Sequence, residues 1–284
     1  MKLNNKKSSI YIPDNQAENI ALERTTHMSI AAHQDDTEIM AYHGISECFG
    51  NNDKWFFSVI ATNGSGSPRN GIYAKFTDEQ MQEVRIKEQK KAAYLGEYSA
   101  LALLNHPSSV VKSQNNVLEN DIKELILNAR PKILYTHNLA DKHDTHVAVS
   151  VKVINVLRSI PEKYHPEKIY GCEVWRNLDW INDNEKVIFD TSKQPNIAAA
   201  LVEIFDSQIS GGKRYDLAIM GRRLSNSTYF AHDKIDNSNS LTYAMDLKPL
   251  ITNKSLSLTD YITEYIDRFK QDVIDKIKKI EAKE

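Results

Sequence analysis

Short apolar runs recur along this chain, and segments with helical spacing separate them. Strands are predicted at 28–32, 55–62, 100–104, 132–136, 169–175 and 187–189. Helices are predicted at 39–49, 77–96 and 117–129, from a cap at Asp144 or Thr145 onward, and at 195–205 and 214–224. Runs of four to eight apolar residues that alternate with helices are typical of βα units. The pattern predicts a Rossmann-like α/β fold, in which helices cover both faces of a mainly parallel sheet.

The remaining segments are expected to surround that sheet. Residues 1–24 are polar and predict an extended N-terminal arm or a capping segment. Residues 226–257 are rich in Asn, Ser and Asp and predict loops over the sheet edge. Residues 258–284 predict a C-terminal amphipathic helix with an apolar residue about every four positions. We expect this stripe to pack on the domain, with a partner-binding role as the alternative. Because no repeat or linker stands out, one domain is predicted over 1–284.

The composition indicates a soluble globular protein. Hydrophobic residues make up 41% of the 284 and charged residues 26%, and the net charge of −2 provides no basic surface for nucleic acid. The two cysteines, Cys48 and Cys172, form no CxxC pattern and indicate free thiols in a reducing compartment. No signal peptide or membrane span is evident, so a cytoplasmic location is expected.

Four ionisable residues directly follow the first predicted strand. His33, Asp35, Asp36 and Glu38 lie where a turn of Gly, Pro or Asn would be usual. In α/β sheets the carboxyl end of a strand is where ligands bind. The Gly-rich loop at 63–68 follows the second strand but matches neither nucleotide pattern, because position 69 is Arg and no Gly-Lys-Ser/Thr follows. The cluster therefore indicates a metal site, with the loop at its rim.

A second cluster follows the fourth predicted strand and contains His137, His143 and His146. His143 and His146 are three positions apart, which would place both on one face of a helix start. Catalytic zinc typically takes three N or O ligands and leaves a position for water, but these residue types also suit iron, cobalt or manganese. The adjacent Asp35 and Asp36 allow one carboxylate to bind metal while the other acts as a base.

The two clusters together resemble the signatures of the PIG-L/LmbE-like family of zinc-dependent N-acetylglucosaminyl deacetylases. Residues 32–38 (AHQDDTE) are similar to the family's AHPDDxE, and 143–146 (HDTH) to its HPDH. The segment 62–64 (TNG) and Arg85-x-x-Glu88 also look like family features. The resemblance covers roughly residues 27–175, and it implies an LmbE-like fold with zinc as the cofactor.

The resemblance also implies roles for individual residues. His33, Asp36 and His146 would bind the metal, and Asp35 would activate a metal-bound water as general base. A protonated His143 would stabilise the oxyanion and release the amine. Arg85 would contact the sugar.

Two departures from the family pattern affect this assignment. Gln34 replaces a proline, which should loosen the turn without removing a ligand. Thr145 replaces the Asp expected to orient the neighbouring His, and Asp141 or Asp144 could substitute for it. His137, Asp141 and Asp144 are further candidates for the pocket. Glu38 is expected to support its loop.

Four other residues are expected to lie outside the chemistry. His106 and His232 predict surface or rim positions, and Tyr170 and Trp175 predict core positions on a strand.

The sequence thus predicts a metal-dependent hydrolase that removes an acyl group, most simply acetyl, from an N-acylated amino sugar or its conjugate. The alternatives are a metal-dependent amidase for a non-sugar amide, and a non-catalytic sugar- or nucleotide-binding protein on the same fold. The expected partner is a small amino-sugar substrate, and a homo-oligomer remains open.

Overall fold

A computed structural model describes residues 1, 3–231 and 235–282, so His232 lies outside the described residues. The strands are β1 (Ser9–Tyr11), β2 (His27–Ala31), β3 (Phe56–Thr62), β4 (Ala100–His106), β5 (Ile133–His137), β6 (Lys168–Cys172), β7 (Val187–Asp190) and β8 (Leu241–Asp246). The α-helices are α1 (Glu18–Glu23), α2 (Asp36–Met40), α3 (Tyr42–Cys48), α4 (Asp78–Leu95), α5 (Ser108–Lys112), α6 (Val117–Ala129), α7 (Asp144–Ser159), α8 (Pro195–Glu203), α9 (Asp206–Ile209), α10 (Tyr215–Tyr229), α11 (Lys248–Thr252) and α12 (Leu258–Glu281). Short 3₁₀ helices are η1 (Gly71–Tyr73), η2 (Glu162–Tyr164) and η3 (Asp183–Glu185).

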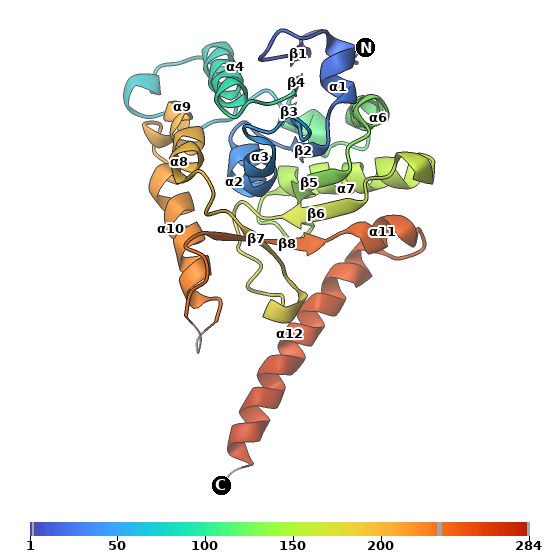
Figure 1. The fold of residues 1–284 in the computed structure, drawn as a ribbon, viewed down its shortest axis with the longest axis vertical. Helices are drawn as coiled ribbons and strands as arrows, with labels where there is room; N and C mark the ends of the chain where they lie inside the picture. Colours follow the sequence, from blue (N-terminus) through green and yellow to red (C-terminus); the bar gives the residue numbers. More distant parts are fainter. Residues whose placement is uncertain (2, 232–234, 283–284) are drawn as a thin grey trace.

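The described strands form one sheet in the order β1-β4-β3-β2-β5-β6-β8-β7. The neighbours from β4 to β6 pair in parallel, whereas β1, β8 and β7 join antiparallel at the two sides. Helices α2, α3, α4, α8 and α10 cover one face, and α6, α7 and α11 cover the other (Figure 1). The predicted α/β fold with a mainly parallel sheet is therefore confirmed.

Strand β2 is where the direction of winding reverses. The chain builds outward from β2 through β3 to β4, then crosses back and places β5 on the other side of β2. The carboxyl ends of β2 and β5 therefore flank a topological switch point, which is the usual ligand site of an open α/β sheet. Both ionisable clusters of the sequence follow these two strands.

Two segments contain strands that the sequence did not predict. The N-terminal arm contributes the edge strand β1, whose Ile10 pairs with Ala102 of β4. The segment 226–257 contains the end of α10, all of α11 and strand β8, which inserts between β6 and β7. Only Leu241, Ala244 and Met245 of β8 are buried, and the surrounding residues rich in Asn and Ser make the strand hard to recognise in the sequence. The prediction of loops there was therefore wrong.

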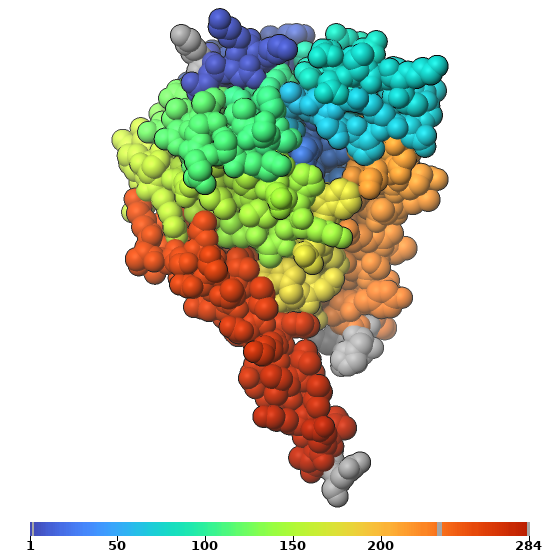
Figure 2. Space-filling model, turned by 180° about the vertical axis from the view of Figure 1, so that it is seen from behind, coloured from blue at the N-terminus to red at the C-terminus, as the bar shows by residue number. Residues whose placement is uncertain are grey.

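Helix α12 leaves the body of the molecule. Its first turns pack against the core through Tyr261 and Ile262, but the later turns extend away from the sheet (Figures 1 and 2). The expectation that the whole apolar stripe packs on the domain was wrong beyond these turns, because Phe269, Val273 and Ile277 of the stripe are exposed. Among the described residues, no helix combines the length and apolar character needed to cross a membrane.

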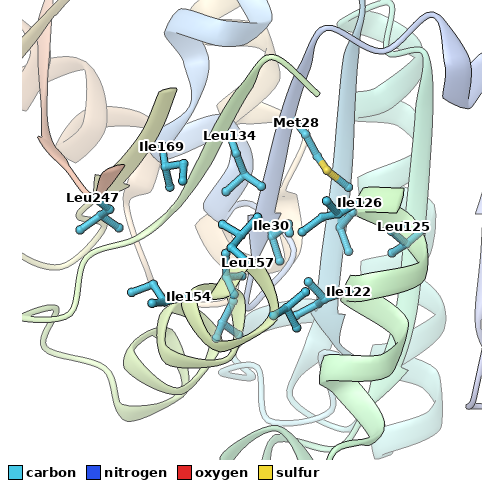
Figure 3. Close-up of a cluster of buried hydrophobic side chains, with 14 of the residues drawn as sticks. Met28, Ile30, Ile122, Leu125, Ile126, Leu134, Ile154, Leu157, Ile169 and Leu247 are labelled. Carbon is cyan, nitrogen blue, oxygen red and sulfur yellow. The ribbon is translucent and has the colours of Figure 1, made fainter. Parts of the chain in front are cut away.

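The larger hydrophobic core lies between the sheet and helices α6 and α7 (Figure 3). Successive residues of a strand point to opposite faces of the sheet. Ile30 therefore packs in this core, while the next residue, Ala31, packs in the smaller core on the other face. The fully buried members drawn in Figure 3 include Met28, Ile30, Ile122, Leu125, Ile126, Leu134, Ile154, Leu157, Ile169 and Leu247. Each such side chain contributes roughly 1.5–3 kcal/mol of burial free energy, which holds the strand ends in register beneath the site.

Candidate active site

A cavity of about 330 Å³ opens at the carboxyl ends of the parallel strands, within the size range of small-molecule sites. Its lining includes His33, Asp35 and Asp36 from the turn after β2, together with His143 before α7 and Arg85 from α4. The two sequence clusters, more than a hundred residues apart, therefore meet in one place. The Gly-rich loop forms part of the rim, as expected, through Gly64, Gly66, Ser67 and Pro68.

The turn after β2 directs its two aspartates to different neighbours. Asp35 has a φ of 86° and a ψ of −32°, a sparsely populated conformation outside the left-handed helical region that costs about 1–3 kcal/mol. Its backbone N–H donates to Gln89 Oε1 over 3.2 Å. The next residue, Asp36, begins α2, and its Oδ2 accepts the backbone N–H of His33 over 2.7 Å.

Gly64 allows the neighbouring loop to approach this turn. Its φ is 74°, and a Cβ there would lie 2.8 Å from Gln34 Oε1 and 2.9 Å from Arg85 Cγ. The turn itself is joined to β3 because Gln34 Nε2 donates to the Thr62 carbonyl over 3.1 Å. Gln34 thus supplies a side-chain contact at the position where the family pattern has proline.

Three potential ligand atoms converge at the base of the cavity. His33 Nδ1 lies 3.1 Å from Asp36 Oδ2 and 3.0 Å from His146 Nε2, and the last two atoms are 3.3 Å apart. Ligands that each lie about 2.0–2.2 Å from a tetrahedral zinc ion are separated by roughly 3.3–3.6 Å. The spacing of the three atoms therefore suits one small divalent metal ion.

The charges around these atoms also suit a cation. Burial opposes ionisation of Asp36, but the neighbouring His146 and His33 outweigh it and hold the pKa of Asp36 well below its usual value. For His146, burial lowers the pKa, but Asp36 and Asp141 outweigh it and raise the pKa to about 10. Two carboxylates thus flank one imidazole in a buried setting, so the donor set favours a positive charge at this point.

Asp141 lies behind His146. Its Oδ1 is 3.3 Å from His146 Nδ1 and accepts the backbone N–H of His143 over 3.0 Å, while its Oδ2 accepts that of Val174 over 3.0 Å. Burial opposes its ionisation, yet the interaction with His146 lowers the pKa of Asp141 to about 2. A carboxylate on the far nitrogen of a metal-binding imidazole fixes its tautomer and orientation. The sequence offered Asp141 or Asp144 to orient His143 in place of Thr145; Asp141 instead contacts the ring of His146, and Asp144 is exposed.

His137 is fully buried beside the same imidazole and is not part of the cavity lining. Its ring stacks on His146 with centroids 3.9 Å apart, and its Nε2 accepts the Ala32 backbone N–H over 2.8 Å. Although Asp36, His137 and His146 could together surround an ion, the Nε2 lone pair of His137 is already used by Ala32. Burial lowers the pKa of His137 to about 4, so it packs against His146 as a neutral imidazole behind the cavity.

His143 caps helix α7, a position that the sequence assigned to Asp144 or Thr145. It has extended backbone angles, and its Nδ1 accepts the backbone N–H of Thr145 over 3.2 Å. This hydrogen bond leaves Nε2 as the nitrogen that can carry a proton toward a ligand. Burial, together with the nearby His33 and His146, lowers the pKa of His143.

Arg85 lines the cavity but is engaged by protein groups. Its Nη2 lies 3.1 Å from Asp35 Oδ2, and its Nη1 lies 3.4 Å from Glu88 Oε2 and 3.2 Å from Ser207 Oγ. Burial raises the pKa of Asp35 to about 6, although Arg85 opposes that rise. Arg85 therefore orients Asp35, a contact that its predicted role in sugar binding did not include.

Several cavity residues were missed in the sequence. They are Trp175 in the loop after β6, Gln208 in α9, Lys213 in the loop that follows α9, and Tyr215 at the start of α10. Trp175 was expected in the core, but β6 ends at Cys172 and the indole is 37% exposed. Lys213 Nζ lies 5.3 Å from the centre of the Trp175 ring, a cation–π contact. The only sequence feature that could have pointed to this wall of the cavity was the presence of Trp175, an aromatic residue that could stack on a ligand.

Two other expectations can be compared directly. His106 is buried, not on the surface, because its Nε2 lies 3.0 Å from Asp121 Oδ2 between β4 and α6. Glu38 does support the loop, as expected, and it does so by accepting hydrogen bonds from Gln89 Nε2 and Tyr98 Oη over 2.8 and 2.7 Å. Burial raises the pKa of Glu38 to about 8.

The fold and this site define an α/β protein with a His/Asp centre at the switch point of its sheet. Residues 28–157 match the family model described as PIG-L: GlcNAc-PI de-N-acetylase, which confirms the resemblance drawn from the motifs. A search of curated proteins gave no match to the chain.

Several solved structures share the fold. N,N'-diacetylchitobiose deacetylase from Pyrococcus horikoshii is 12% identical with a TM-score of 0.64, over 85% of this chain and 90% of its own. The conserved protein TT1542 from Thermus thermophilus is 15% identical with a TM-score of 0.61, over 78% and 94%. GalB, the 4-carboxy-2-hydroxymuconate hydratase of Pseudomonas putida, is 13% identical with a TM-score of 0.60, over 78% and 95%. At these identities each likeness is one of fold.

Proposed function

We propose that this protein is a metal-dependent deacylase that hydrolyses the amide of an N-acylated amino sugar or its conjugate, with acetyl as the acyl group. The observation that carries the proposal is the convergence of His33 Nδ1, Asp36 Oδ2 and His146 Nε2 within 3.3 Å of one another, beside a carboxylate outside that triangle, Asp35. The family match over 28–157 supports the reaction class. The fold alone does not, because a hydratase shares it.

The three convergent residues would hold zinc, or another divalent metal such as iron or cobalt. A metal held there would polarise the amide carbonyl and acidify a bound water. Asp141 would keep His146 in the tautomer that presents Nε2, since its carboxylate lies at the opposite ring nitrogen.

Asp35 is the proposed general base. It lines the cavity next to Asp36, and its 3.1 Å contact with Arg85 holds the carboxylate in place. Asp35 takes a proton from the attacking water as the water oxygen bonds to the amide carbon. The proton then passes to the nitrogen as the carbon–nitrogen bond breaks, so the products are a carboxylic acid and a free amine.

His143 is proposed to stabilise the oxyanion. Its Nδ1 accepts the Thr145 N–H, which leaves an Nε2–H to donate a hydrogen bond as negative charge develops on the former carbonyl oxygen. A neutral imidazole suffices for this donation. This role therefore needs no protonated His143, unlike the role implied by the family resemblance.

The cavity walls are proposed to bind the sugar. Trp175 presents a partly exposed indole, and Tyr215 lies against it with ring centroids 6.1 Å apart. Aromatic faces of this kind offer an apolar surface to the C–H groups of a ring, while polar residues at the cavity fix its hydroxyls. Lys112 and Lys213 also line the cavity.

An assay of acid and amine release tests this proposal. The purified protein, loaded with zinc, is incubated with free N-acetylglucosamine, N-acetylglucosamine glycosides and phosphate conjugates, and simple N-acetyl amines. We expect release of acetate and amine in equal amounts from at least one sugar, and none from the Asp35→Asn variant. Cleavage of the simple amines alone would replace the proposal with a non-sugar amidase. Metal binding without hydrolysis of any of these compounds would contradict it.

A further inference from the structure

A second, smaller cavity of about 20 Å³ lies between α2, α10, β8 and the loop after β6. None of the described residues that line it also lines the larger cavity of the candidate active site. Its charged lining residues are Glu173, Arg176, Arg222 and Arg223. Three guanidinium groups and one carboxyl group therefore surround a space of about the size of one water molecule or one monatomic anion.

Arg223 is 1% exposed, and its guanidinium is only partly paired. Its Nη2 donates to the carbonyl oxygens of Glu38 and Ile39 in α2 over 2.9 and 3.3 Å. Its Nε and Nη1 are buried and have no hydrogen-bond partner among the described residues. A buried donor without a partner is costly, and more so when the group is charged. These two nitrogens therefore call for an acceptor other than the described side chains around them.

The charge of Arg223 is also not neutralised by a carboxylate in the part of the chain that the structure describes. The Tyr42 ring lies 4.8 Å from the guanidinium carbon, which gives a cation–π contact but no negative charge. Burial lowers the pKa of Arg223 to about 10, so the group stays protonated at neutral pH. The carboxyl oxygens of Glu173 already accept hydrogen bonds from Leu178 N and Trp180 Nε1. An anion beside Arg223 would therefore offset the cost of burying its charge.

Thr242 brings a second unpaired donor to the same space. Its Oγ1 is buried and has no hydrogen-bond partner among the residues that the structure describes. Thr242 lines the small cavity from β8, whereas Arg223 lines it from α10. A guanidinium only donates hydrogen bonds, and a hydroxyl can donate one. The two side chains thus fit an occupant that accepts hydrogen bonds from both.

A water molecule is the main rival occupant. Water must donate two hydrogen bonds as well as accept them, and it carries no charge. The polar acceptors of the lining are already in use, because the side-chain oxygens of Asn177 and Asn226 each accept from the other's amide nitrogen over 3.1 and 2.7 Å. An anion only accepts, so it suits this donor set better than water does.

We propose that the small cavity is a structural site for a monatomic anion, chloride, held by Arg223 Nε and Nη1 and by Thr242 Oγ1. Phosphate and sulfate are too large for a space of this volume. The anion would neutralise the guanidinium that holds the last carbonyl groups of α2. The proposal does not depend on the activity of the larger cavity.

The test measures thermal unfolding of the full-length chain in sodium chloride and in sodium gluconate at equal ionic strength, because gluconate is too large for the cavity. Chloride at about ten times its dissociation constant should raise the midpoint by roughly 2–4 °C over gluconate, and the rise should level off at higher chloride.

Three variants locate the effect. Thr242→Val keeps the shape of the side chain but removes the donor, so about tenfold more chloride should be needed for the same rise. The matched control, Thr252→Val at an exposed position of α11, should respond like the wild type. Arg223→Met should show no difference between the two salts. If this variant does not fold, the comparison of the two threonine variants still decides.

Anomalous diffraction from crystals grown in sodium bromide should show bromide beside Arg223 Nη1. Equal midpoints in the two salts, or an unchanged chloride response in Thr242→Val, would overturn the proposal. A cavity that shows density without a bromine signal would assign the site to water instead.

Discussion

The Arg85 Nη2 atom lies 3.1 Å from the Asp35 Oδ2 atom, and both side chains are almost fully buried beside the cavity. This contact joins α4 to the turn after β2, and it holds the Arg85 guanidinium at the edge of the cavity. The proposed base is thus held by a guanidinium that is itself fixed by Glu88 and Ser207.

Replacing Arg85 should impair turnover more than substrate binding. In the Arg85→Met variant, Asp35 loses its orienting partner and Glu88 loses its counterion, so we expect kcat to fall by about 10²-fold and stability by about 1–3 kcal/mol. Steady-state kinetics and urea unfolding measure the two effects. A rise in KM at unchanged kcat would instead indicate that Arg85 mainly binds the sugar. Arg69→Met, at the partly exposed Arg69–Asp78 pair, is the control.

Replacing Asp141 should weaken metal binding. The Asp141→Asn variant keeps side-chain atoms near the backbone N–H groups of His143 and Val174 but loses the charge that orients His146. Loss of such an outer partner typically costs 10–100-fold in metal affinity. Competition with a chromophoric chelator should show this loss, and activity should recover when metal is added. Asp144→Asn, at an exposed site, should bind metal like the wild type.

Removing the indole of Trp175 should raise KM. The ring is partly exposed in the cavity, and loss of one aromatic face for the sugar should cost about 1.4 kcal/mol, or tenfold in affinity, with little change in kcat. The comparison is with Trp55→Ala, because Trp55 packs under Arg24 at the opposite end of the strands. An unchanged KM in the Trp175→Ala variant would place sugar binding elsewhere in the cavity.

Glu173 should make stability depend on pH. Its carboxylate accepts hydrogen bonds from Leu178 N and Trp180 Nε1, but burial raises its pKa from an ordinary 4.5 to about 7. The folded state therefore holds the proton more tightly than the unfolded chain. Its contribution is present below about pH 4.5 and is lost as the pH rises through about 7, a change of about 3 kcal/mol.

The Glu173→Gln variant should lack this part of the pH dependence. Urea unfolding between about pH 5 and pH 8 should show a smaller decline in the free energy of unfolding than in the wild type. The exposed Glu162→Gln serves as the control. Parallel declines in the wild type and the Glu173 variant would show that Glu173 does not titrate in this range.

The sequence predicted the sheet and the convergence of the two clusters, because both follow from local patterns. Buried runs such as 132–136 are recognisable from their apolar residues, and parallel strands bring their carboxyl ends to one edge. The pattern could not reveal β8, since an antiparallel insertion depends on pairing with distant strands. The pattern also could not place Trp175 at the cavity, because that placement depends on β6 ending at Cys172. It could not show the contact between Asp141 and His146 either, because that contact depends on the packing of the folded chain.

The projecting part of α12 is a second feature that the sequence could not place. An amphipathic stripe predicts that one face is covered, but the sequence does not say by what. Here the body of the protein covers only the first turns, through Tyr261 and Ile262.

The central claim is that Asp36 binds metal while its neighbour Asp35 does not, and that both are needed for hydrolysis. The most direct measurement is the zinc content of the wild type, Asp35→Asn and Asp36→Asn by mass spectrometry, with acetate release measured on the same samples. We predict one zinc per chain in the wild type and in Asp35→Asn, little or none in Asp36→Asn, and acetate release from the wild type alone. Loss of zinc in Asp35→Asn, or acetate release by metal-free protein, would contradict this account.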